Sequence, residues 1–495
     1  MGTGCRGRGV PVAMSTTTPP SRAAVERLVG SAPDGDCFDV FEPATGEHLA
    51  RVTDSSTVDI ETAIVAASDA LPSWASMPGW ERFEVLRRCV NALREVAGEL
   101  AELICAETGK PLAEARGEAA NTIRFFEWFS HETLRLHGEY WPGITGDRDA
   151  AVLREPVGVV AAITPWNFPA FLVACKVGAA IAAGCTVVHK PAEQTPLTAL
   201  ALAGVFERAG LPAGVWNVVT ASRPEQVGDV LLSAPEIACV SFTGSRMVGE
   251  RIMRAAAGTI KRVLLELGGN SPAVVLADAD LDLTAAQLVR ARFLNAGQAC
   301  MAANRVYAVE PVFDTLVEKL REHTETLRVG DPREAGTNLG PLIDLAAVKR
   351  LEDQLAAAVG QGGKLVTGGR RSSENAVSAF LEPALIAAPG DAPPAVFREE
   401  MFGPALAVVR CRDEEDAVRL ANATEYGLAG YVFTRDRQRA LAVARRLVVG
   451  SVAVNRALIS EPQLPFGGAK ASGLGRERGR AGVEEFLELK TVHLG

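Results

Sequence analysis

From residue 157 onward, short apolar runs alternate with longer amphipathic stretches. In the first series the runs fall at residues 157–164, 186–189, 215–219 and 238–242, and helical patterns such as 197–208 separate them. Apolar runs of this length are typical of strands that are buried on both faces. Strands that alternate with helices predict a parallel, doubly wound sheet with right-handed crossovers, so the expected fold class is α/β.

A second series of the same kind begins after Glu266. We expect strands near residues 272–276, 306–309, 405–409 and 451–455, and helices near residues 281–295 and 312–328. A second α/β domain is the simplest explanation. Two doubly wound parallel-sheet domains also agree with the length of 495 residues, which is too long for a single core.

Three other patterns precede these series. Apolar positions recur at spacings of three and four between Phe83 and Ile104, which predicts one long amphipathic helix. Glycines and a proline among alternating residues at 137–155 suggest a hairpin. Residues 1–36 have few bulky apolar side chains, so we expect a flexible extension. A G-x-G-x-x-G match at residues 2–7 does not indicate a dinucleotide site, because no strand precedes it and no helix pattern follows it.

Composition and charge exclude several classes of partner. The formal net charge is −9, and no basic cluster occurs beyond the amino-terminal tail, which argues against nucleic acid or an anionic membrane. Prolines and polar residues interrupt the most apolar region, 157–188, so it does not predict a membrane span. Nine dispersed cysteines without a CxxC pair favour a reduced, cytoplasmic setting. Six dispersed histidines without paired-ligand spacing argue against a metal site.

Three polar residues stand out as candidates for chemistry. Cys300 follows an apolar helical run that breaks at Gly297, and it could be a nucleophile or simply a packed thiol; spacing alone favours packing. Thirty-four residues upstream, Glu266 lies in an apolar strand that ends in paired glycines, where a carboxylate needs a partner or a function. Asn167 provides an amide donor in a loop bracketed by prolines.

Seven motifs around these residues stand in one order and resemble the aldehyde dehydrogenase superfamily from about Phe41 to Val492. They are PWNFP (165–169), KPAEQTP (190–196), FTGS (242–245), LELGGNSP (265–272), GQAC (297–300), EEMFGP (399–404) and PFGG-K-SG-GRE (465–477). The resemblance implies an NAD-binding domain (37–136 and 156–265), a catalytic domain (266–479) and a small β oligomerisation element (137–155 and 480–495). It also implies a homodimer or homotetramer.

The resemblance implies a role for each candidate in oxidising an aldehyde to a carboxylate. Cys300 would attack the carbonyl, and the Asn167 amide and the Cys300 backbone N–H would hold the oxyanion of the thiohemiacetal. Glu266 would activate water to hydrolyse the thioester, which separates the chain from the acylating branch, where coenzyme A resolves the thioester. Glu477 would relay protons, although a plain salt bridge to Arg476 or Arg478 is an equal alternative.

The expected cofactor is NAD. Lys190 and Glu193 follow a buried strand at its carboxyl end, where doubly wound sheets bind ligands, although spacing alone favours a solvated loop pair. In the family both address the adenosine ribose, and a carboxylate there repels a 2′-phosphate, so NADP is disfavoured. The further cofactor-binding residues implied by the resemblance are Thr164, Trp166, Gly244, Ser245, Leu267, Glu400 and Phe402.

The substrate is expected to be a neutral aliphatic or aromatic aldehyde. Residues 126–129, 176–179 and 458–460 are similar to the succinate-semialdehyde group, but the two arginines with which that group holds the substrate carboxylate are replaced by Cys175 and Leu294. The residues expected to form the substrate tunnel are apolar: Phe168, Phe171, Leu172, Cys175, Leu294, Met301 and Phe466. The alternatives are succinate-semialdehyde dehydrogenase-like activity, or a non-catalytic NAD-binding relative, which would be expected to lose Cys300, Asn167 or Glu266.

Overall fold

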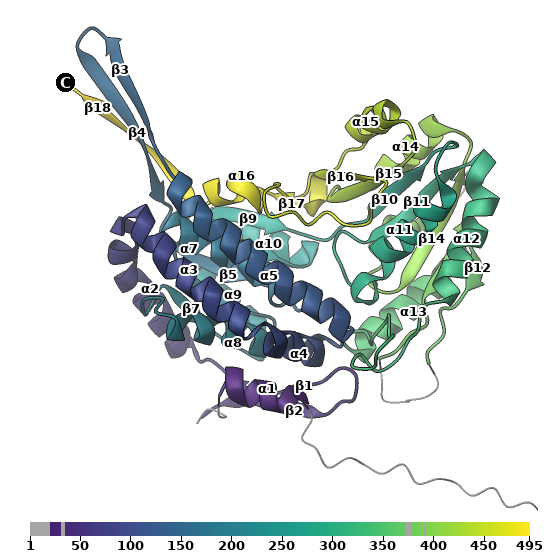
Figure 1. The fold of residues 1–495 in the computed structure, drawn as a ribbon, viewed down its shortest axis with the longest axis horizontal. Coiled ribbons are helices and arrows are strands. Elements are labelled where there is room, and N and C mark those ends of the chain that lie inside the picture. The colour runs from purple at the N-terminus through teal and green to yellow at the C-terminus, as the bar shows by residue number, and fades with distance from the viewer. Residues whose placement is uncertain (1–19, 31–34, 373–378, 391–392) are drawn as a thin grey trace, which may run out of the picture.

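Two lobes, each built around a β-sheet, and a projecting three-stranded arm make up the molecule (Figure 1). The computed structural model describes residues 20–30, 35–372, 379–390 and 393–495. The G-x-G-x-x-G match at residues 2–7 lies outside the described residues. Within them, no helix combines the length and the apolar run that crossing a bilayer requires.

The first lobe contains a six-stranded sheet in the order β17-β9-β8-β5-β6-β7. Its strands run parallel except β17, so the chain winds from β5 to β7 in one direction and through β8 to β9 in the other. Both faces of the sheet are buried, because Val160 and Val187 join one apolar cluster while Val159 and Val188 join another. The bounds are β5 Val159–Ile163, β6 Thr186–Lys190, β7 Trp216–Val218, β8 Ile237–Thr243, β9 Arg262–Glu266 and β17 Gly473–Leu474.

Helices cover both faces of this sheet (Figure 1). A π-helical turn, Ala174–Gly178, joins α6 to α7 and carries Cys175 and Lys176. The bounds are α2 Thr57–Ser76, α3 Gly79–Glu95, α4 Ala97–Thr108, α5 Leu112–Glu132, α6 Phe171–Val173, α7 Ala179–Ala183, α8 Pro196–Arg208, α9 Pro224–Ser233 and α10 Arg246–Ala257.

Two expectations for the amino-terminal part are wrong. The helix expected over 83–104 is two helices, α3 and α4, because the backbone leaves helical geometry at Val96. The apolar spacing continues across this break, since both helices face the same core. The extension expected over 1–36 contains a packed helix, α1 (Pro20–Leu28), whose Val25 and Leu28 are buried. Beside it, β1 (Cys37–Phe41) and β2 (His48–Thr53) form an antiparallel pair.

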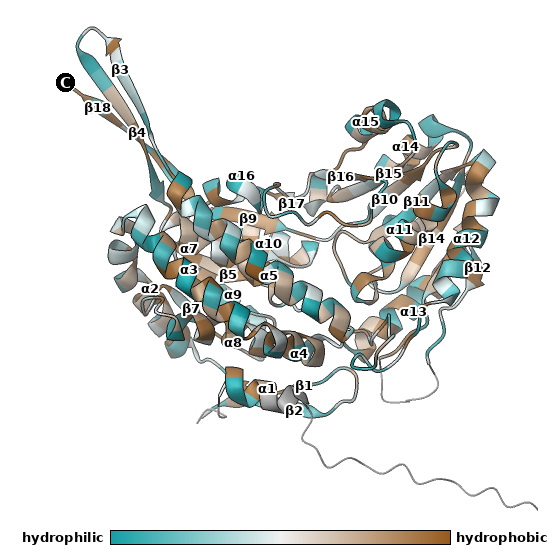
Figure 2. Ribbon diagram, viewed as in Figure 1, coloured by the Kyte–Doolittle hydropathy of each residue, from teal (hydrophilic) through white to brown (hydrophobic). Residues whose placement is uncertain are grey.

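The second lobe contains a seven-stranded sheet in the order β12-β13-β14-β11-β10-β15-β16, parallel except for β12. All expected strands of the second series are present, and brown, apolar residues fill the interior in Figure 2. The strands are β10 Ser271–Val275, β11 Ala303–Val309, β12 Lys364–Thr367, β13 Ala384–Ala388, β14 Ala405–Cys411, β15 Ala429–Phe433 and β16 Ser451–Val454. The helices are α11 Leu281–Phe293, α12 Phe313–Glu325, α13 Leu345–Gly360, α14 Glu414–Asn422 and α15 Arg437–Arg446.

The arm consists of the expected hairpin, β3 (Glu139–Thr145) and β4 (Arg148–Pro156), with the carboxyl-terminal strand β18 (Leu487–Leu494) paired to β4 (Figure 1). A short helix, α16 (Gly479–Glu484), leads from the lobes into β18. Every residue of β3 is exposed, and its outer edge has no partner strand within the described residues. An edge of this kind is available for pairing or packing with another chain.

Candidate active site

A cavity of about 1220 Å³ lies where loops of the two lobes meet. The first lobe contributes the loops after β5, β8 and β9, which leave the carboxyl edge of its sheet. The doubly wound order changes direction between β5 and β8, and ligands bind at such a switch point. The second lobe contributes the segment before β11, which contains Cys300.

The Cys300 segment has an unusual backbone. Helix α11 ends at Phe293, not at 295, because Asn295, Ala296 and Gly297 all adopt positive φ of 51–73°. Only glycine takes such angles readily, so the surroundings must hold this turn in place. The Glu114 carboxylate accepts from the Asn295 N–H at 2.8 Å. Cys300 at the end of the segment is partly exposed to the cavity.

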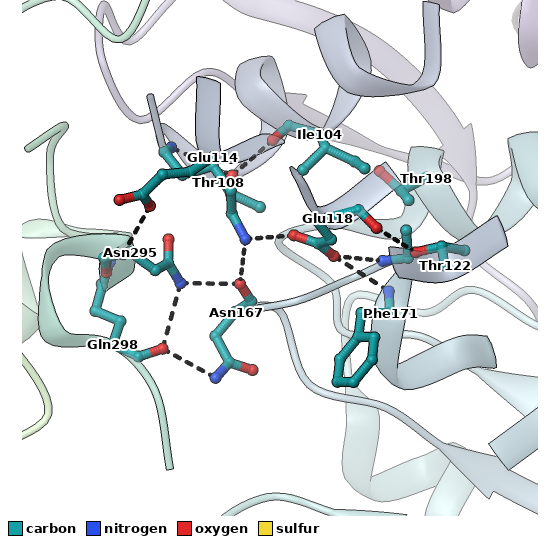
Figure 3. Close-up of polar contacts among 12 residues, drawn as sticks. Ile104, Thr108, Glu114, Glu118, Thr122, Asn167, Phe171, Thr198, Asn295 and Gln298 are labelled. Carbon is teal, nitrogen blue, oxygen red and sulfur yellow. Dashed lines mark hydrogen bonds and ion pairs between the residues drawn. The ribbon is translucent and has the colours of Figure 1, made fainter. Parts of the chain in front are cut away.

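A buried hydrogen-bond network fixes Asn167 against this turn (Figure 3). The Asn167 amide Nδ2 donates to the Gln298 carbonyl at 2.9 Å, and Asn295 Nδ2 donates to the Asn167 carbonyl at 2.9 Å. Lys110 Nζ donates to the same carbonyl at 2.8 Å and pairs with Glu118, whose other oxygen accepts from the Phe171 N–H. The second Asn167 amide hydrogen remains available to a reacting oxygen in the cavity.

Glu266, at the end of β9, is 2% exposed, and within the described residues its oxygens accept no hydrogen bond from an N–H or O–H group, while the Cys300 thiol lies within hydrogen-bonding reach of the carboxyl group. Burial, and then repulsion from Glu477, raise the pKa of Glu266 to about 7. Burial and the neighbouring Glu266 raise the pKa of the Cys300 thiol well above its ordinary value. A neutral thiol therefore stands beside a carboxyl group that can take up a proton near neutral pH.

Glu477 is buried and forms an ion pair with Lys176 of the π-helical turn. The salt bridge to Arg476 or Arg478 that the sequence left open is absent among the described residues, and Lys176 takes that place as the partner of Glu477. Burial of Lys176 at 1% exposure makes such a partner necessary.

Several residues at the cavity suit a dinucleotide. Ser245 caps α10, and the buried Thr243 Oγ1 forms no hydrogen bond within the part of the chain that the structure describes. Backbone N–H groups at a helix start can bind a pyrophosphate. Of the expected cofactor residues, those that line the cavity are Trp166, Gly244, Ser245, Leu267, Glu400 and Phe402.

Two contacts join neighbouring walls of the cavity. Glu400 Oε1 accepts from the Gly269 N–H at 3.0 Å, and the Trp166 and Phe402 rings meet edge to face with centroids 5.6 Å apart. A Cβ on Gly269 would lie 2.3 Å from the Cys300 carbonyl oxygen, so glycine is required there.

Three expected cofactor residues, Thr164, Lys190 and Glu193, do not line this cavity. They lie together at the carboxyl ends of β5 and β6, where the Thr164 N–H donates to the Lys190 carbonyl at 3.1 Å. Lys190 Nζ pairs with the Glu193 carboxylate at 3.2 Å, and burial lowers the pKa of Lys190. Their place along the sheet edge is the one expected for the adenosine half of a dinucleotide.

The substrate wall differs from expectation at two positions. Phe168, Phe171, Leu172, Leu294 and Met301 line the cavity, but Cys175 and Phe466 do not. An arginine that sequence reasoning had assigned only to a salt bridge, Arg478, covers the Phe466 ring, with its Cζ 4.0 Å from the centroid, and itself lines the cavity. Cys175 is 1% exposed and lies behind it.

Comparison with known proteins agrees with this geometry. A model of the aldehyde dehydrogenase family matches residues 30–492. The chain is 44% identical over 474 residues to 3-sulfolactaldehyde dehydrogenase of Pseudomonas putida, covering 96% of this chain and 97% of that protein. It is 44% identical over 464 residues to the NADP(+) succinate-semialdehyde dehydrogenase of Escherichia coli (strain K12), covering 94% and 95%.

Among solved structures, succinate-semialdehyde dehydrogenase from Burkholderia pseudomallei has a TM-score of 0.90 at 42% identity, covering 94% of this chain and 97% of that chain. Both the sequence and the arrangement of the two lobes are thus shared over nearly the full length. The chain belongs to the aldehyde dehydrogenase family.

Proposed function

We propose that this aldehyde dehydrogenase uses NAD to oxidise a small aldehyde through a Cys300 thiohemiacetal and a thioester that water hydrolyses. The observation that supports this most is that Cys300, Asn167 and Glu266 line one cavity. A direct test is NADH absorbance after the protein is mixed with NAD and a panel of aldehydes. No NADH from any aldehyde would overturn the proposal.

The first half of the reaction needs a thiolate and an oxyanion site. Because burial keeps the Cys300 thiol protonated, Glu266 would take its proton as the sulfur attacks the carbonyl carbon. The Asn167 amide and the Cys300 backbone N–H would donate to the oxyanion. A dinucleotide bound by the cavity residues named above would supply the hydride acceptor, and the loss of hydride would leave a thioester on Cys300.

The second half needs a base that is open to water. Among the described residues no N–H or O–H group donates to Glu266, and in the thioester Cys300 has no thiol proton to donate, so the carboxylate can accept a proton from a water molecule that attacks the thioester. The Lys176–Glu477 pair beside Glu266 would carry the Cys300 proton away from Glu266 before water attacks, and would later carry away the proton taken from water, which gives Glu477 a relay role. Hydrolysis then releases the carboxylate and restores the thiol.

The choice of NAD rests on Glu193. Its side chain is 33% exposed and is held at the sheet edge by Lys190, where a 2′-phosphate would meet a carboxylate. The relative from Escherichia coli is named for NADP(+), so this preference is a property that the present chain must be tested for. Trp166, Glu400 and Phe402 would hold the nicotinamide half.

Substitution of Glu193 by serine is expected to narrow the preference for NAD over NADP by roughly tenfold, or about 1.4 kcal/mol, because it removes the repulsion of the 2′-phosphate. The measurement is kcat/KM for both cofactors with one aldehyde. Glu207→Ser, an exposed change at the end of α8, is the control and should leave the ratio unchanged. An unmodified enzyme that prefers NADP would refute this role of Glu193.

The absence of arginine at positions 175 and 294 predicted a neutral aldehyde, and most of the substrate wall is indeed apolar. A second candidate, a semialdehyde-like substrate, is favoured by Arg478 in the same wall. Two relatives are named for succinate semialdehyde and 3-sulfolactaldehyde, each of which carries an anionic group.

We also propose that the arm joins chains into a homodimer or homotetramer. Tyr140 and Trp141 on β3 are 60% and 54% exposed. The outer edge of β3 has backbone groups that a second chain could pair with or pack against. Light scattering is expected to give a mass at least twice that of one chain. Replacement of both aromatic residues by aspartate should lower the mass or weaken the assembly, whereas a monomeric unmodified protein would contradict the proposal.

A further inference from the structure

Arg478 has a buried guanidinium that the mechanism above does not use. The residue is 4% exposed, and its side chain lies among three aromatic rings, with Cζ 4.0 Å from the centroid of Phe466 and 5.0 Å from that of Phe171. Arg478 Nη1 donates to the Ile459 carbonyl at 3.0 Å, while Nε has no partner. The guanidinium is therefore only partly satisfied by the protein.

No carboxylate within the described part of the chain forms an ion pair with Arg478. The adjacent Glu477 is engaged by Lys176, and Glu266 interacts electrostatically with Arg478 without forming an ion pair with it. A buried cation without a counter-ion is costly unless a ligand supplies the negative charge. Aromatic faces stabilise a guanidinium in part, but they leave its N–H groups free to bind an anion.

The backbone conformation at Arg478 also indicates that its side chain has a function. Its φ is 65°, in the left-handed region that favours glycine, and Gly479 follows at 57°. A long side chain at such a position is strained, so glycine would be the better choice for folding alone. The presence of arginine at this strained position therefore agrees with a function for the side chain.

Arg478 belongs to a polar patch in the otherwise apolar substrate wall. Ser460 and Asn121 line the same cavity, and the Asn121 amide donates to Ser460 Oγ at 3.4 Å. Ser460 follows Ile459, the carbonyl of which accepts from Arg478, so the three side chains lie at one end of the wall. A planar guanidinium flanked by a hydroxyl and an amide matches the oxygens of a carboxylate.

We propose that Arg478 is a specificity-determining residue that binds a carboxylate at the far end of a short aldehyde while the carbonyl carbon reaches Cys300. This inference rests on the proposed aldehyde oxidation. Positions 175 and 294 lack the arginines that hold the substrate carboxylate in the succinate-semialdehyde group. Arg478, from a different segment of the chain, would supply a guanidinium in their place, because its side chain lies against the Cys175 thiol.

The test compares succinate semialdehyde with hexanal, a neutral aldehyde of similar length, in the full-length enzyme with saturating NAD. Arg478→Gly removes the side chain at a φ that glycine adopts freely, and Arg478→Gln keeps much of its bulk. In both variants kcat/KM for succinate semialdehyde should fall roughly 10- to 100-fold, chiefly through KM, whereas hexanal should change less than about threefold. Arg445→Gln, at an exposed arginine in the last turn of α15 that does not line the cavity, is the control and should leave the ratio of the two substrates unchanged.

A rescue variant separates recognition from structure. Cys175→Arg combined with Arg478→Gly returns a guanidinium to the same end of the wall from the helix, and it should restore much of the preference for succinate semialdehyde. Calorimetric titration with succinate supplies a readout besides turnover, and binding should be lost in Arg478→Gly. Equal losses on both aldehydes, or an unchanged ratio, would overturn the role of Arg478. Failure of the unmodified enzyme to oxidise any aldehyde would instead overturn the proposed function.

Discussion

Replacement of Cys300 by alanine is expected to abolish aldehyde oxidation and to leave NAD binding nearly intact. The thiol would form every covalent intermediate. The expected adenosine-binding pair, Lys190 and Glu193, lies at the carboxyl end of β6 in the first lobe, whereas Cys300 precedes β11 in the second lobe. Loss of a nucleophile typically lowers turnover by at least about three orders of magnitude. The measurement is steady-state NADH formation together with NAD affinity by fluorescence quenching.

The matched control for this substitution is Cys105→Ala, at a buried thiol of α4 that does not line the cavity. It should keep near-normal turnover, because its burial raises the thiol pKa to about 12 and leaves it unreactive. Turnover of Cys300→Ala within tenfold of the unmodified enzyme would remove Cys300 from the reaction.

Glu266→Gln is expected to accumulate the thioester. Because the Cys300 thiol can still lose its proton to water, whereas hydrolysis requires the base, a slowed first turnover of NADH should appear as a burst, followed by a steady rate lowered by at least about 10²-fold. Because the Glu266 pKa is about 7, its basic form grows as pH rises through neutrality, so the steady rate of the unmodified enzyme should rise over pH 6–8. The variant should lose that rise.

Glu114→Gln distinguishes a reacting carboxyl from a structural one. Burial also raises the pKa of Glu114 to about 7, but its carboxylate holds the Asn295 N–H, a bond that a glutamine carbonyl can also accept. Its pH profile should therefore remain that of the unmodified enzyme. A Glu266→Gln enzyme with ordinary steady turnover would show that another group activates water.

The sheets were predictable because strands buried on both faces must be apolar along their whole length. The helix break at Val96 was not predictable. Apolar spacing shows only which side of a helix faces the core, so it stays the same when two helices that pack on one core are separated by a bend. The end of α11 was misplaced for a related reason: Asn295 and Ala296 leave helical geometry only because Glu114 and Asn167 hold that turn from elsewhere in the chain.

The residues of the candidate site were predictable where a sequence motif contains the reactive side chain. They were not predictable where the hydrogen-bond or ion-pair partner is distant in sequence. Cys300, Asn167 and Glu266 meet at one cavity, as the motifs implied. The partner of Glu477 was missed because Lys176 lies 301 residues away in sequence, whereas Arg476 and Arg478 are its neighbours. Arg478 itself was overlooked for the same reason, since sequence proximity gives no indication of which side chains enter a cavity.

The segment from β17 to β18 connects three parts of the molecule in one short stretch. Gly473 pairs with Glu266 at the end of β9, Arg478 enters the substrate wall, and Leu487 begins the strand that completes the arm. An insertion or deletion between these points would shift all three against one another. With the roles proposed above for Arg478 and the arm, exchange of this stretch between relatives would transfer substrate preference and subunit contacts together, so the two properties are expected to diversify together.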